Sequence, residues 1–400
     1  MLKESLTENF YNFISDNKDE KTTELYLKWR DKNPDINLDL AITQIECRRK
    51  CHRKLSEFIK NPAFIFPTQL SSEQASHQAV SLYHSKLIGK GSDVLDMTAG
   101  LGIDSMTIAK AGNNVTACEI DELKGEALSH NAASLNIPLT IEVADSVKFL
   151  SSGKTKYDVI FIDPARRDDS QKRVYNFKDC QPDVTSLQFL FRNHAPHILI
   201  KASPLLDVSQ TLKDLENIEC LHIVSINGEC KEVLIEIDYN KDHNALSPSF
   251  KALDMDNEGN IKTLFEFVDN EVRNNPVYLT DLSRMGYLYE PNASVMKLQP
   301  WGILASRYPS LKKFGADSNI FASDELINDF PGRIMQIIKI IDKKNRKAFK
   351  GYPVNIVSRN YPLSADQLRK QLSAKEGKDE FLYATRLNQS PVLIHCKKIR

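Results

Sequence analysis

Seven short apolar stretches between residues 66 and 238 constrain the fold of this chain more than any other feature. Each has five to seven residues rich in Val, Ile and Leu, which is typical of strands buried on both faces of a sheet. Helix-sized segments such as 102–111 and 122–135 separate them, so crossover connections and a largely parallel sheet are expected. The sequence therefore predicts an α/β fold with strands at Asp93–Met97, Asn114–Glu119, Leu139–Val143, Tyr157–Asp163, His197–Lys201, Leu221–Ser225 and Val233–Ile237.

The segments on either side of the predicted sheet have different patterns. Residues 1–65 carry apolar side chains at helical separations, so a helical N-terminal region is expected there. The sheet domain is placed at 66–240, and 241–330 is expected to hold a small further piece after a connection. The polar residues of that connection are 240–259. A compact α+β domain is predicted over 331–400, with strands at 333–341, 354–358, 381–387 and 392–397 and a helix at 364–372.

The charge of the chain is segregated. The net charge is zero, yet residues 331–400 hold 16 Lys and Arg against 5 Asp and Glu, a net charge of +11. A basic module favours a polyanionic partner, because each lysine or arginine that meets a phosphate releases condensed counterions. A solvated surface that the acidic remainder neutralises is an equally good interpretation of the charge alone.

The composition excludes several classes of protein. Among the 400 residues no apolar run approaches the ~18 that would span a bilayer, so no membrane partner is expected. The first residues lack the apolar stretch of a secretory signal, and the seven cysteines are scattered, which favours a reducing cytoplasm. Cys47 and Cys51 have no second pair of ligands at a recognisable spacing, so no metal is expected.

The first predicted strand leads into Asp96-Met-Thr-Ala-Gly-Leu-Gly102, where an acid precedes two glycines that open a helix. Glycines there allow a tight turn and the close approach of a ligand. A dinucleotide-binding loop would continue to a third glycine, but Ser105 stands in that place and Asp96 would repel a pyrophosphate. The cationic sulfonium and amino groups of S-adenosylmethionine would be attracted instead. A purely structural turn is the alternative.

Acids also end the next two predicted strands. Glu119 follows the second strand, where its carboxylate can accept hydrogen bonds from both hydroxyls of a ribose. Asp145 follows the third, where it can accept the hydrogens of an adenine amino group. The three acids in order predict a nucleoside site. Upstream, Ser71–Gln74 fits a helix start whose polar side chains could close over the methionine end of the ligand.

The fourth predicted strand ends in Asp163-Pro-Ala-Arg-Arg167. Asp-Pro suits a plain turn at the end of a strand. As chemistry, the Asp163 carboxylate and the Pro164 carbonyl can each accept one hydrogen of an exocyclic amine and favour its pyramidal, nucleophilic geometry. Catalysis would then rest on orientation and electrostatics without a covalent intermediate. The forks of Arg166 and Arg167 could pair with phosphate or stack on a base.

Three further features leave alternatives open. Cys180 is the cysteine best placed for covalent carbon methylation, but an ordinary loop thiol is the default. Lys201 and Glu229 face the same end of the sheet and fit members of a structural ion pair. The basic cluster 48–54 could hold RNA phosphate or form an exposed helical face.

Val94–Asp104, Asp163–Arg166 and the seven-strand order together resemble a class I S-adenosylmethionine-dependent methyltransferase, with its Rossmann-like sheet, over roughly residues 66–240. The chain is similar to bacterial proteins that follow this domain with a ferredoxin-like piece and a THUMP-like domain, the latter a module associated with RNA binding. More distantly, it resembles RNA cap guanine amino methyltransferases of the trimethylguanosine synthase type. The tail segments that carry the resemblance are 289–294, 330–333, 358–363 and 393–396.

The resemblance implies a set of site residues. The sequence departs from it in two places: Thr98 stands where many relatives have glycine, and Ala165-Arg166 replaces a proline and an aromatic residue that stack the substrate base. The residues expected to act in catalysis are Asp163, Pro164 and Arg166. Those expected to bind S-adenosylmethionine are Gln74, Asp96, Thr98, Ala99, Gly100, Gly102, Glu119, Ile120, Asp145 and Ser146.

The leading hypothesis is a cytoplasmic RNA methyltransferase that transfers a methyl group from S-adenosylmethionine to a base nitrogen, an exocyclic amine in ribosomal or transfer RNA. One alternative is a methyltransferase acting on a protein or a small molecule, with the basic tail used for assembly. The other is a non-catalytic RNA-binding assembly factor that retains the fold, which the arginine at position 166 motivates. The oligomeric state stays open.

Overall fold

The computed structural model describes residues 2–30, 32, 36–166, 176–241, 247–342 and 345–399. The chain divides into two compact units. The first consists of Met1–Asn227, Lys231–Pro248 and Met255–Lys262, and the second of Gly228–Cys230, Ser249–Asp254 and Thr263–Arg400.

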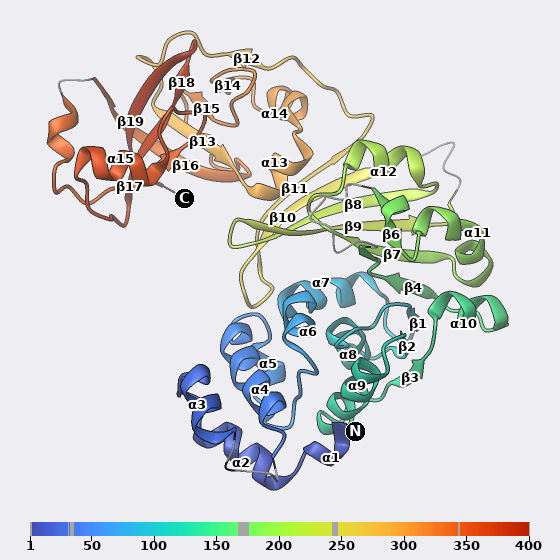
Figure 1. Ribbon diagram of the computed structural model, residues 1–400. Helices are drawn as coiled ribbons and strands as arrows, with labels where there is room; N and C mark the ends of the chain where they lie inside the picture. The colour runs from blue at the N-terminus through green and yellow to red at the C-terminus, as the bar shows by residue number, and fades with distance from the viewer. Residues whose placement is uncertain are drawn as a thin grey trace. The chain divides into compact units, whose positions relative to one another are not determined.

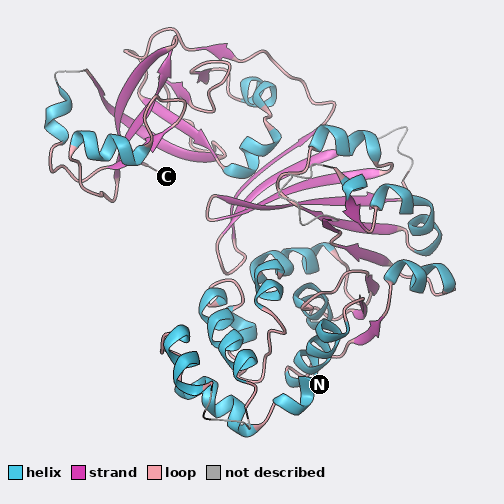
Figure 2. Cartoon of the chain, viewed as in Figure 1, coloured by secondary structure: helices cyan, strands magenta, loops and turns pink. Residues whose placement is uncertain are grey.

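The first unit begins with helices only, as expected for residues 1–65 (Figure 2). Apolar side chains on these helices, such as Phe10, Leu40 and Ile45, pack into one buried cluster, which also contains Ala127. The helices are α1 (Leu2–Ser5), α2 (Glu8–Asp16), α3 (Thr22–Trp29), α4 (Leu38–Cys51), α5 (Ser56–Ile59), α6 (Gln69–Gln74) and α7 (Gln78–Leu87).

The basic cluster 48–54 is largely engaged with the backbone. The Arg48 guanidinium donates hydrogen bonds to the carbonyls of Ile59, Asn61, Pro62 and Phe64, at 2.6 to 3.3 Å. Burial lowers the pKa of Arg48. Arg49 donates to two carbonyls of the loop after α2, and Lys54 donates to two carbonyls at the end of α6. These contacts favour a structural role for most of the cluster.

A nine-stranded sheet follows, in the order β11-β10-β8-β9-β7-β4-β1-β2-β3 (Figure 1). All seven predicted strands are present, and the α/β prediction is confirmed. The predicted strand number was too low by two, because Ser249–Met255, where a connection was expected, and Ile261–Val268 also form strands of this sheet. The strands are β1 (Asp93–Asp96), β2 (Asn114–Glu119), β3 (Thr140–Val143), β4 (Val159–Ile162), β7 (His197–Ala202), β8 (Ile218–Ile226), β9 (Glu229–Asp238), β10 (Ser249–Met255) and β11 (Ile261–Val268).

Strands β3, β2, β1, β4 and β7 are parallel, and β9 is antiparallel to β7. Figure 1 shows α7, α8 and α9 on one side of this part of the sheet and α10, α11 and α12 on the other. The carboxyl ends of β1, β2, β3 and β4 therefore meet at one edge. The covering helices and the small connecting elements are α8 (Ile103–Lys110), α9 (Glu122–Ser134), α10 (Ser146–Ser152), β5 (Ala165–Arg166), η1 (Phe177–Asp179), β6 (Cys180–Gln181), α11 (Val184–His194) and α12 (Val208–Asp214).

The second unit is built on an eight-stranded sheet in the order β12-β14-β15-β13-β16-β19-β18-β17. The strands are β12 (Val277–Tyr278), β13 (Tyr287–Pro291), β14 (Lys312–Lys313), β15 (Phe321–Ser323), β16 (Gly332–Ile341), β17 (Asn355–Ser358), β18 (Glu380–Leu387) and β19 (Ser390–Lys398). The helices are α13 (Ala293–Leu298), α14 (Trp301–Arg307), η2 (Asn345–Phe349) and α15 (Ala365–Leu372). All four predicted strands are present in this sheet, and Ser364 caps α15 as proposed.

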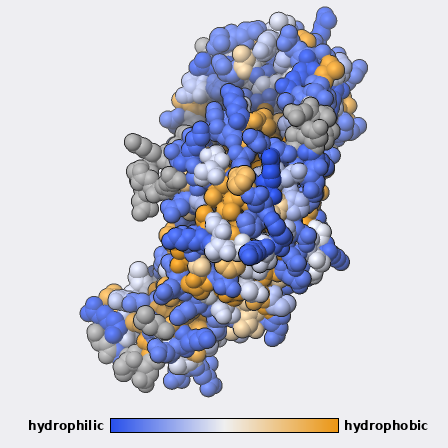
Figure 3. Space-filling model, turned by 90° about the vertical axis from the view of Figure 1, so that its right-hand side faces the viewer, coloured by the Kyte–Doolittle hydropathy of each residue, from blue (hydrophilic) through white to orange (hydrophobic). Residues whose placement is uncertain are grey.

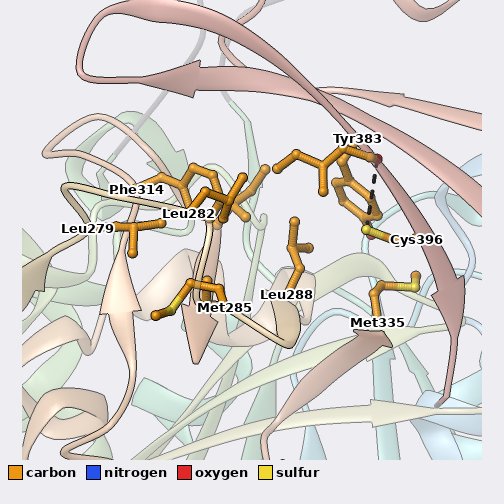
Figure 4. Packing of buried hydrophobic residues seen from close by; sticks show 11 residues of the cluster. Leu279, Leu282, Met285, Leu288, Phe314, Met335, Tyr383 and Cys396 are labelled. Carbon is orange, nitrogen blue, oxygen red and sulfur yellow. Dashed lines mark hydrogen bonds between the residues drawn. The ribbon is translucent and has the colours of Figure 1, made fainter. Parts of the chain in front are cut away.

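Two features hold the second unit together. One is a buried cluster that includes Leu279, Leu282, Met285, Leu288, Phe314, Met335, Tyr383 and Cys396 (Figure 4). The other is the buried carboxylate of Glu290, which accepts hydrogen bonds from Arg333, Arg359 and the Tyr383 hydroxyl, at 2.9 to 3.3 Å. Glu290 on β13 thus ties residues of β13, β16 and β18 to the loop after β17.

The described part of the chain contains no helix that is both long and apolar enough to cross a membrane. Hydrophilic side chains cover most of the face that Figure 3 shows, with hydrophobic areas between them. Scattered exposed apolar residues of this kind are normal on folded proteins.

Candidate active site

The glycine motif forms a tight turn between β1 and α8. Gly100 and Gly102 both have positive φ, +56° and +79°. A Cβ atom at Gly102 would lie 2.0 Å from the Leu128 side chain, so only glycine fits there. The Ala99 N–H donates to the Cys118 carbonyl at 2.9 Å, which holds the turn against the end of β2.

Asp96 lies beneath this turn and is 1% exposed. Its carboxylate accepts hydrogen bonds from the Thr98 N–H at 3.0 Å and from the Ser105 hydroxyl. Burial, with a smaller contribution from neighbouring Asp104 and Asp163, raises the pKa of Asp96 to about 7, although these two hydrogen bonds lower it. Asp96 therefore shapes the turn, and a cation bound above it would favour the ionised carboxylate.

Glu119 connects the turn to the end of β2. One carboxylate oxygen accepts the Gly100 N–H at 2.7 Å and the other accepts the Asp121 N–H at 2.9 Å. The exposed side chain of Ile120, 68% accessible, follows directly. An acceptor pair beside an exposed apolar side chain suits the ribose and adenine faces of a nucleoside.

Asp145 stands at the same edge. It caps α10 by accepting the N–H groups of Val147 and Lys148, at 3.0 and 3.2 Å. The Ala144 N–H donates to the Glu119 carbonyl at 3.0 Å, which ties the ends of β2 and β3 together. The structure thus brings Asp96, Glu119 and Asp145 to neighbouring strand ends, although the carboxylates of all three already accept hydrogen bonds from the chain.

We expect Glu119→Ala to weaken the binding of S-adenosylmethionine by about 10- to 100-fold, because the hydrogen bonds from the two ribose hydroxyls to the Glu119 carboxylate would be lost. Isothermal calorimetry on the purified full-length chain measures this affinity. The matched control is Glu122→Gln, an exposed acid in the first turn of α9. Unchanged affinity in the Glu119 variant would remove this residue from the cofactor site.

Asp163 follows β4 and faces the turn. Its N–H donates to the Thr98 hydroxyl at 2.7 Å. Thr98, which stands where many relatives have glycine, therefore joins the glycine motif to the end of β4. The Asp163 side chain is 36% exposed and pairs directly with the Lys201 ammonium at the end of β7. Burial raises the pKa of Asp163, and Lys201 opposes that rise.

A network of buried polar groups continues from Lys201. The Lys201 ammonium also donates to the Ser76 hydroxyl at 2.9 Å, and Ser76 donates to Asp104 on α8. Burial lowers the pKa of Lys201, but the carboxylates of Asp163, Asp104 and Glu232 outweigh burial and leave that pKa raised. Lys201 is therefore a fixed cation that orients the Asp163 carboxylate.

His84 on α7 is the last member of this network and is fully buried. Its Nδ1 lies 2.9 Å from Asp104 Oδ1 and its Nε2 lies 2.5 Å from Glu232 Oε1 on β9. Burial lowers the pKa of His84, yet Glu232 and Asp104 raise it to about 10. His84 is thus a buried imidazolium between two carboxylates, and it fixes Asp104 beneath the site.

Replacing Lys201 with methionine should move the acidic limb of the pH–rate profile to higher pH. The methionine removes the cation that opposes protonation of Asp163, so the pKa of Asp163 rises further and less carboxylate is present at neutral pH. We expect turnover at pH 7 to fall at least about tenfold. Lys201→Arg keeps the charge and serves as the control. An unshifted profile in the methionine variant would show that Lys201 does not act on Asp163.

The remaining predicted residues lie as follows. Gln74 is exposed at the end of α6, which begins at Gln69 with Thr68 as its cap, two residues before the predicted start. The Ala165–Arg166 strand pairs with β6, and its register sets Arg166 opposite Cys180. The alternative nucleophile Cys180 thus lies near the Asp163-Pro164 segment. Arg167 lies outside the described residues.

Most residues of the buried network were not predictable from the sequence. Ser76, His84 and Glu232 carried no signal, because His84 and Glu232 meet across 148 positions of the chain. Asp104 ends the segment Val94–Asp104, whose pattern predicts no separate role for it. Lys201 was expected in an ion pair, and the structure supplies its partner, Asp163.

The sheet order, with five parallel strands followed by an antiparallel one, and the glycine turn at its carboxyl edge define the class I methyltransferase fold. Family models match two segments in the second unit: a ferredoxin-like domain over residues 287–331 and a THUMP domain-like module over residues 332–398. Strands β13 and β16, one from each segment, pair antiparallel. No curated protein matches the chain.

Among solved structures, the chain is similar to a protein of Porphyromonas gingivalis W83 that is described as a candidate methyltransferase. The two share 27% identity, the match covers 98% of each chain, and the TM-score is 0.83. Two further matches have TM-scores too low to carry an argument. One is Pyrococcus abyssi tRNA (uracil-54, C5)-methyltransferase, with 20% identity, coverage of 44% of this chain and 40% of that chain, and a TM-score of 0.29. The other is Thermus thermophilus 16S rRNA N2 G1207 methyltransferase, with 13% identity, coverage of 41% of this chain and 43% of that chain, and a TM-score of 0.31.

Proposed function

We propose that this protein is an RNA methyltransferase that transfers a methyl group from S-adenosylmethionine to a base nitrogen, specifically an exocyclic amine of ribosomal or transfer RNA. The observation that carries the proposal is the hydrogen bond between Thr98 and Asp163. It joins the turn that would hold the methyl donor to the acidic residue that would receive the acceptor.

The residues at the sheet edge fit S-adenosylmethionine. Glu119 and Asp145 offer carboxylate oxygens beside the exposed Ile120, and the buried Asp96 adds negative charge beneath the glycine turn. These hydrogen-bond acceptors and their negative charge suit a cationic nucleoside and disfavour a phosphate. Bound there, the cofactor would supply an electrophilic methyl group.

Asp163 and Pro164 would receive the amine. The Asp163 carboxylate and the Pro164 carbonyl each accept one of its hydrogens, which orients the nitrogen lone pair away from the base ring. The ion pair with Lys201 holds the carboxylate in place. The proton leaves the nitrogen after transfer and passes to Asp163 or to water.

The charge of the second unit supports RNA as the substrate class. Residues 331–400 carry +11, and a cavity of about 670 Å³ in this unit is lined by Tyr278, Tyr361 and Arg386 among others. Aromatic side chains and an arginine that line one cavity suit stacked bases and phosphate. The THUMP domain-like match over 332–398 agrees with this assignment.

The experiment that tests the proposal compares modified nucleosides in RNA from cells with and without the gene, by mass spectrometry. We expect one methylated nucleoside to disappear and to return on expression of the wild-type chain but not of Asp163→Asn. Identical nucleoside profiles, together with no calorimetric binding of S-adenosylmethionine, would overturn the proposal. Methylation of protein with RNA unchanged would favour the protein-substrate alternative.

A further inference from the structure

A second cluster of ionisable side chains lies in the first unit, apart from the residues of the candidate active site. Cys220 and His222 share one face of β8, and Glu236 comes from the neighbouring strand β9. One potential ligand atom of each residue lies within 4.8 Å of the others. Cys220 is 2% exposed and His222 is fully buried.

The geometry around His222 favours a shared ligand over a hydrogen bond. His222 Nε2 lies 3.1 Å from Glu236 Oε2, yet among the described residues this nitrogen has no hydrogen-bond partner. The two atoms are close but poorly aligned for a hydrogen bond. Two ligands of a tetrahedral zinc ion, each at about 2.1 Å, stand about 3.4 Å apart, so the separation fits a common ion.

The other nitrogen of His222 has the partner that a metal-binding histidine needs. His222 Nδ1 lies 2.6 Å from the Tyr83 hydroxyl on α7. When the Nδ1–H donates to the tyrosine oxygen, Nε2 keeps its lone pair for a metal. The Glu236 side chain is 21% exposed, which leaves a route for an ion and for a water molecule in the fourth position.

We propose that Cys220, His222 and Glu236 bind a divalent transition-metal ion of the zinc type, with Tyr83 orienting the histidine. A thiolate, an imidazole and a carboxylate form a ligand set that zinc accepts and that magnesium and calcium do not favour. The ion links β8, β9 and, through Tyr83, α7. Its role is structural, because it ties the antiparallel strands of the sheet to the helix that carries His84.

The test begins with the untagged full-length chain, since a histidine tag would bind metal itself. After removal of metals with a chelator, the protein is titrated with Co²⁺ and then with Zn²⁺. We expect one Co²⁺ per chain with a sulfur-to-cobalt charge-transfer band, displacement of that band by Zn²⁺, and a higher melting temperature with Zn²⁺ than without. Mass spectrometry of the elements in protein purified without chelator should find about one zinc per chain.

Three variants separate the ligands from their surroundings. Cys220→Ser should lose the charge-transfer band, Tyr83→Phe should lower Co²⁺ affinity by about tenfold, and Cys230→Ser, a β9 cysteine outside the cluster, should behave as wild type. A wild-type chain that is folded by circular dichroism but shows no band and no zinc-dependent melting shift would overturn the proposal. Binding that persists unchanged in Cys220→Ser would overturn it as well.

Discussion

Asp163→Asn is expected to lower the turnover of methyl transfer by about 100-fold or more while leaving the affinity for S-adenosylmethionine unchanged. The amide keeps the shape of the side chain but presents an N–H group where the substrate amine needs an acceptor, and it carries no charge to stabilise the developing positive nitrogen. The backbone N–H of Asp163 still reaches Thr98, so the cofactor turn should keep its conformation. Turnover with labelled cofactor on RNA from a strain lacking the gene measures the first quantity, and calorimetry measures the second.

The matched control for this substitution is Asp19→Asn, an exposed acid in a turn near the N-terminus. It should leave both quantities unchanged. If Asp163→Asn methylates at the wild-type rate, the Asp163-Pro164 segment does not receive the acceptor, and the pairing of Arg166 with Cys180 would make Cys180 the next residue to replace.

His84→Leu should produce the largest loss of stability of the substitutions considered. The leucine leaves the buried carboxylates of Asp104 and Glu232 facing one another without the imidazolium that separates them. Breaking a buried ion pair by removing one partner costs about 3 to 5 kcal/mol. Urea unfolding followed by circular dichroism measures the free energy of unfolding, and the exposed His52→Leu is the control.

The pH dependence of the wild-type chain provides a second readout of His84. Its folded-state pKa of about 10 lies above the unfolded value of 6.5. A histidine whose pKa is raised on folding contributes stability that is fully present below pH 6.5 and is lost as the pH rises through 10. We expect the free energy of unfolding to fall over this window in the wild type and much less in His84→Leu. If His84→Leu lowers the free energy of unfolding by less than about 1 kcal/mol relative to the wild type, the carboxylates of Asp104 and Glu232 find other partners.

The sequence predicted the sheet well because buried parallel strands leave an unambiguous pattern. The apolar stretches before Asp96, Glu119 and Asp163 each form a strand, and the α/β fold class with its helical N-terminal region is confirmed. Residues 249–255 were assigned to a connection because the polar residues before them dominate the composition. Their burial, in which Phe250, Ala252, Leu253 and Met255 are buried and the residues between them are partly exposed, is that of a sheet strand.

The candidate site was predictable where its residues follow strands and unpredictable where they meet through tertiary packing. Asp96, Glu119 and Asp145 lie where the order of strand ends places them, and their roles in binding remain predictions. The network of Ser76, His84, Asp104 and Glu232 depends on how α7 packs against the sheet. Composition and local spacing carry no information about that packing.

The basic cluster 48–54 shows the same limit. Its charges suggested either RNA contact or a solvated face, but Arg48 holds four backbone carbonyls of the segment that leads from α5 towards α6. In a segment without regular secondary structure, an arginine can donate the hydrogen bonds that the backbone carbonyls would otherwise receive from a helix or a sheet. Net charge alone cannot separate this use from binding to a polyanion.

The Thr98 hydroxyl links the turn after β1 to the backbone at the end of β4. Under the proposed function, it would connect the binding site of the methyl donor to that of the acceptor. A glycine at this position would let the two loops adjust independently to substrates of different thickness. Under the proposed function, this hydrogen bond would couple the movements of the two loops, so the protein would set the distance that the methyl group travels. Such an enzyme would accept a narrower range of substrates and would align each of them in the same way.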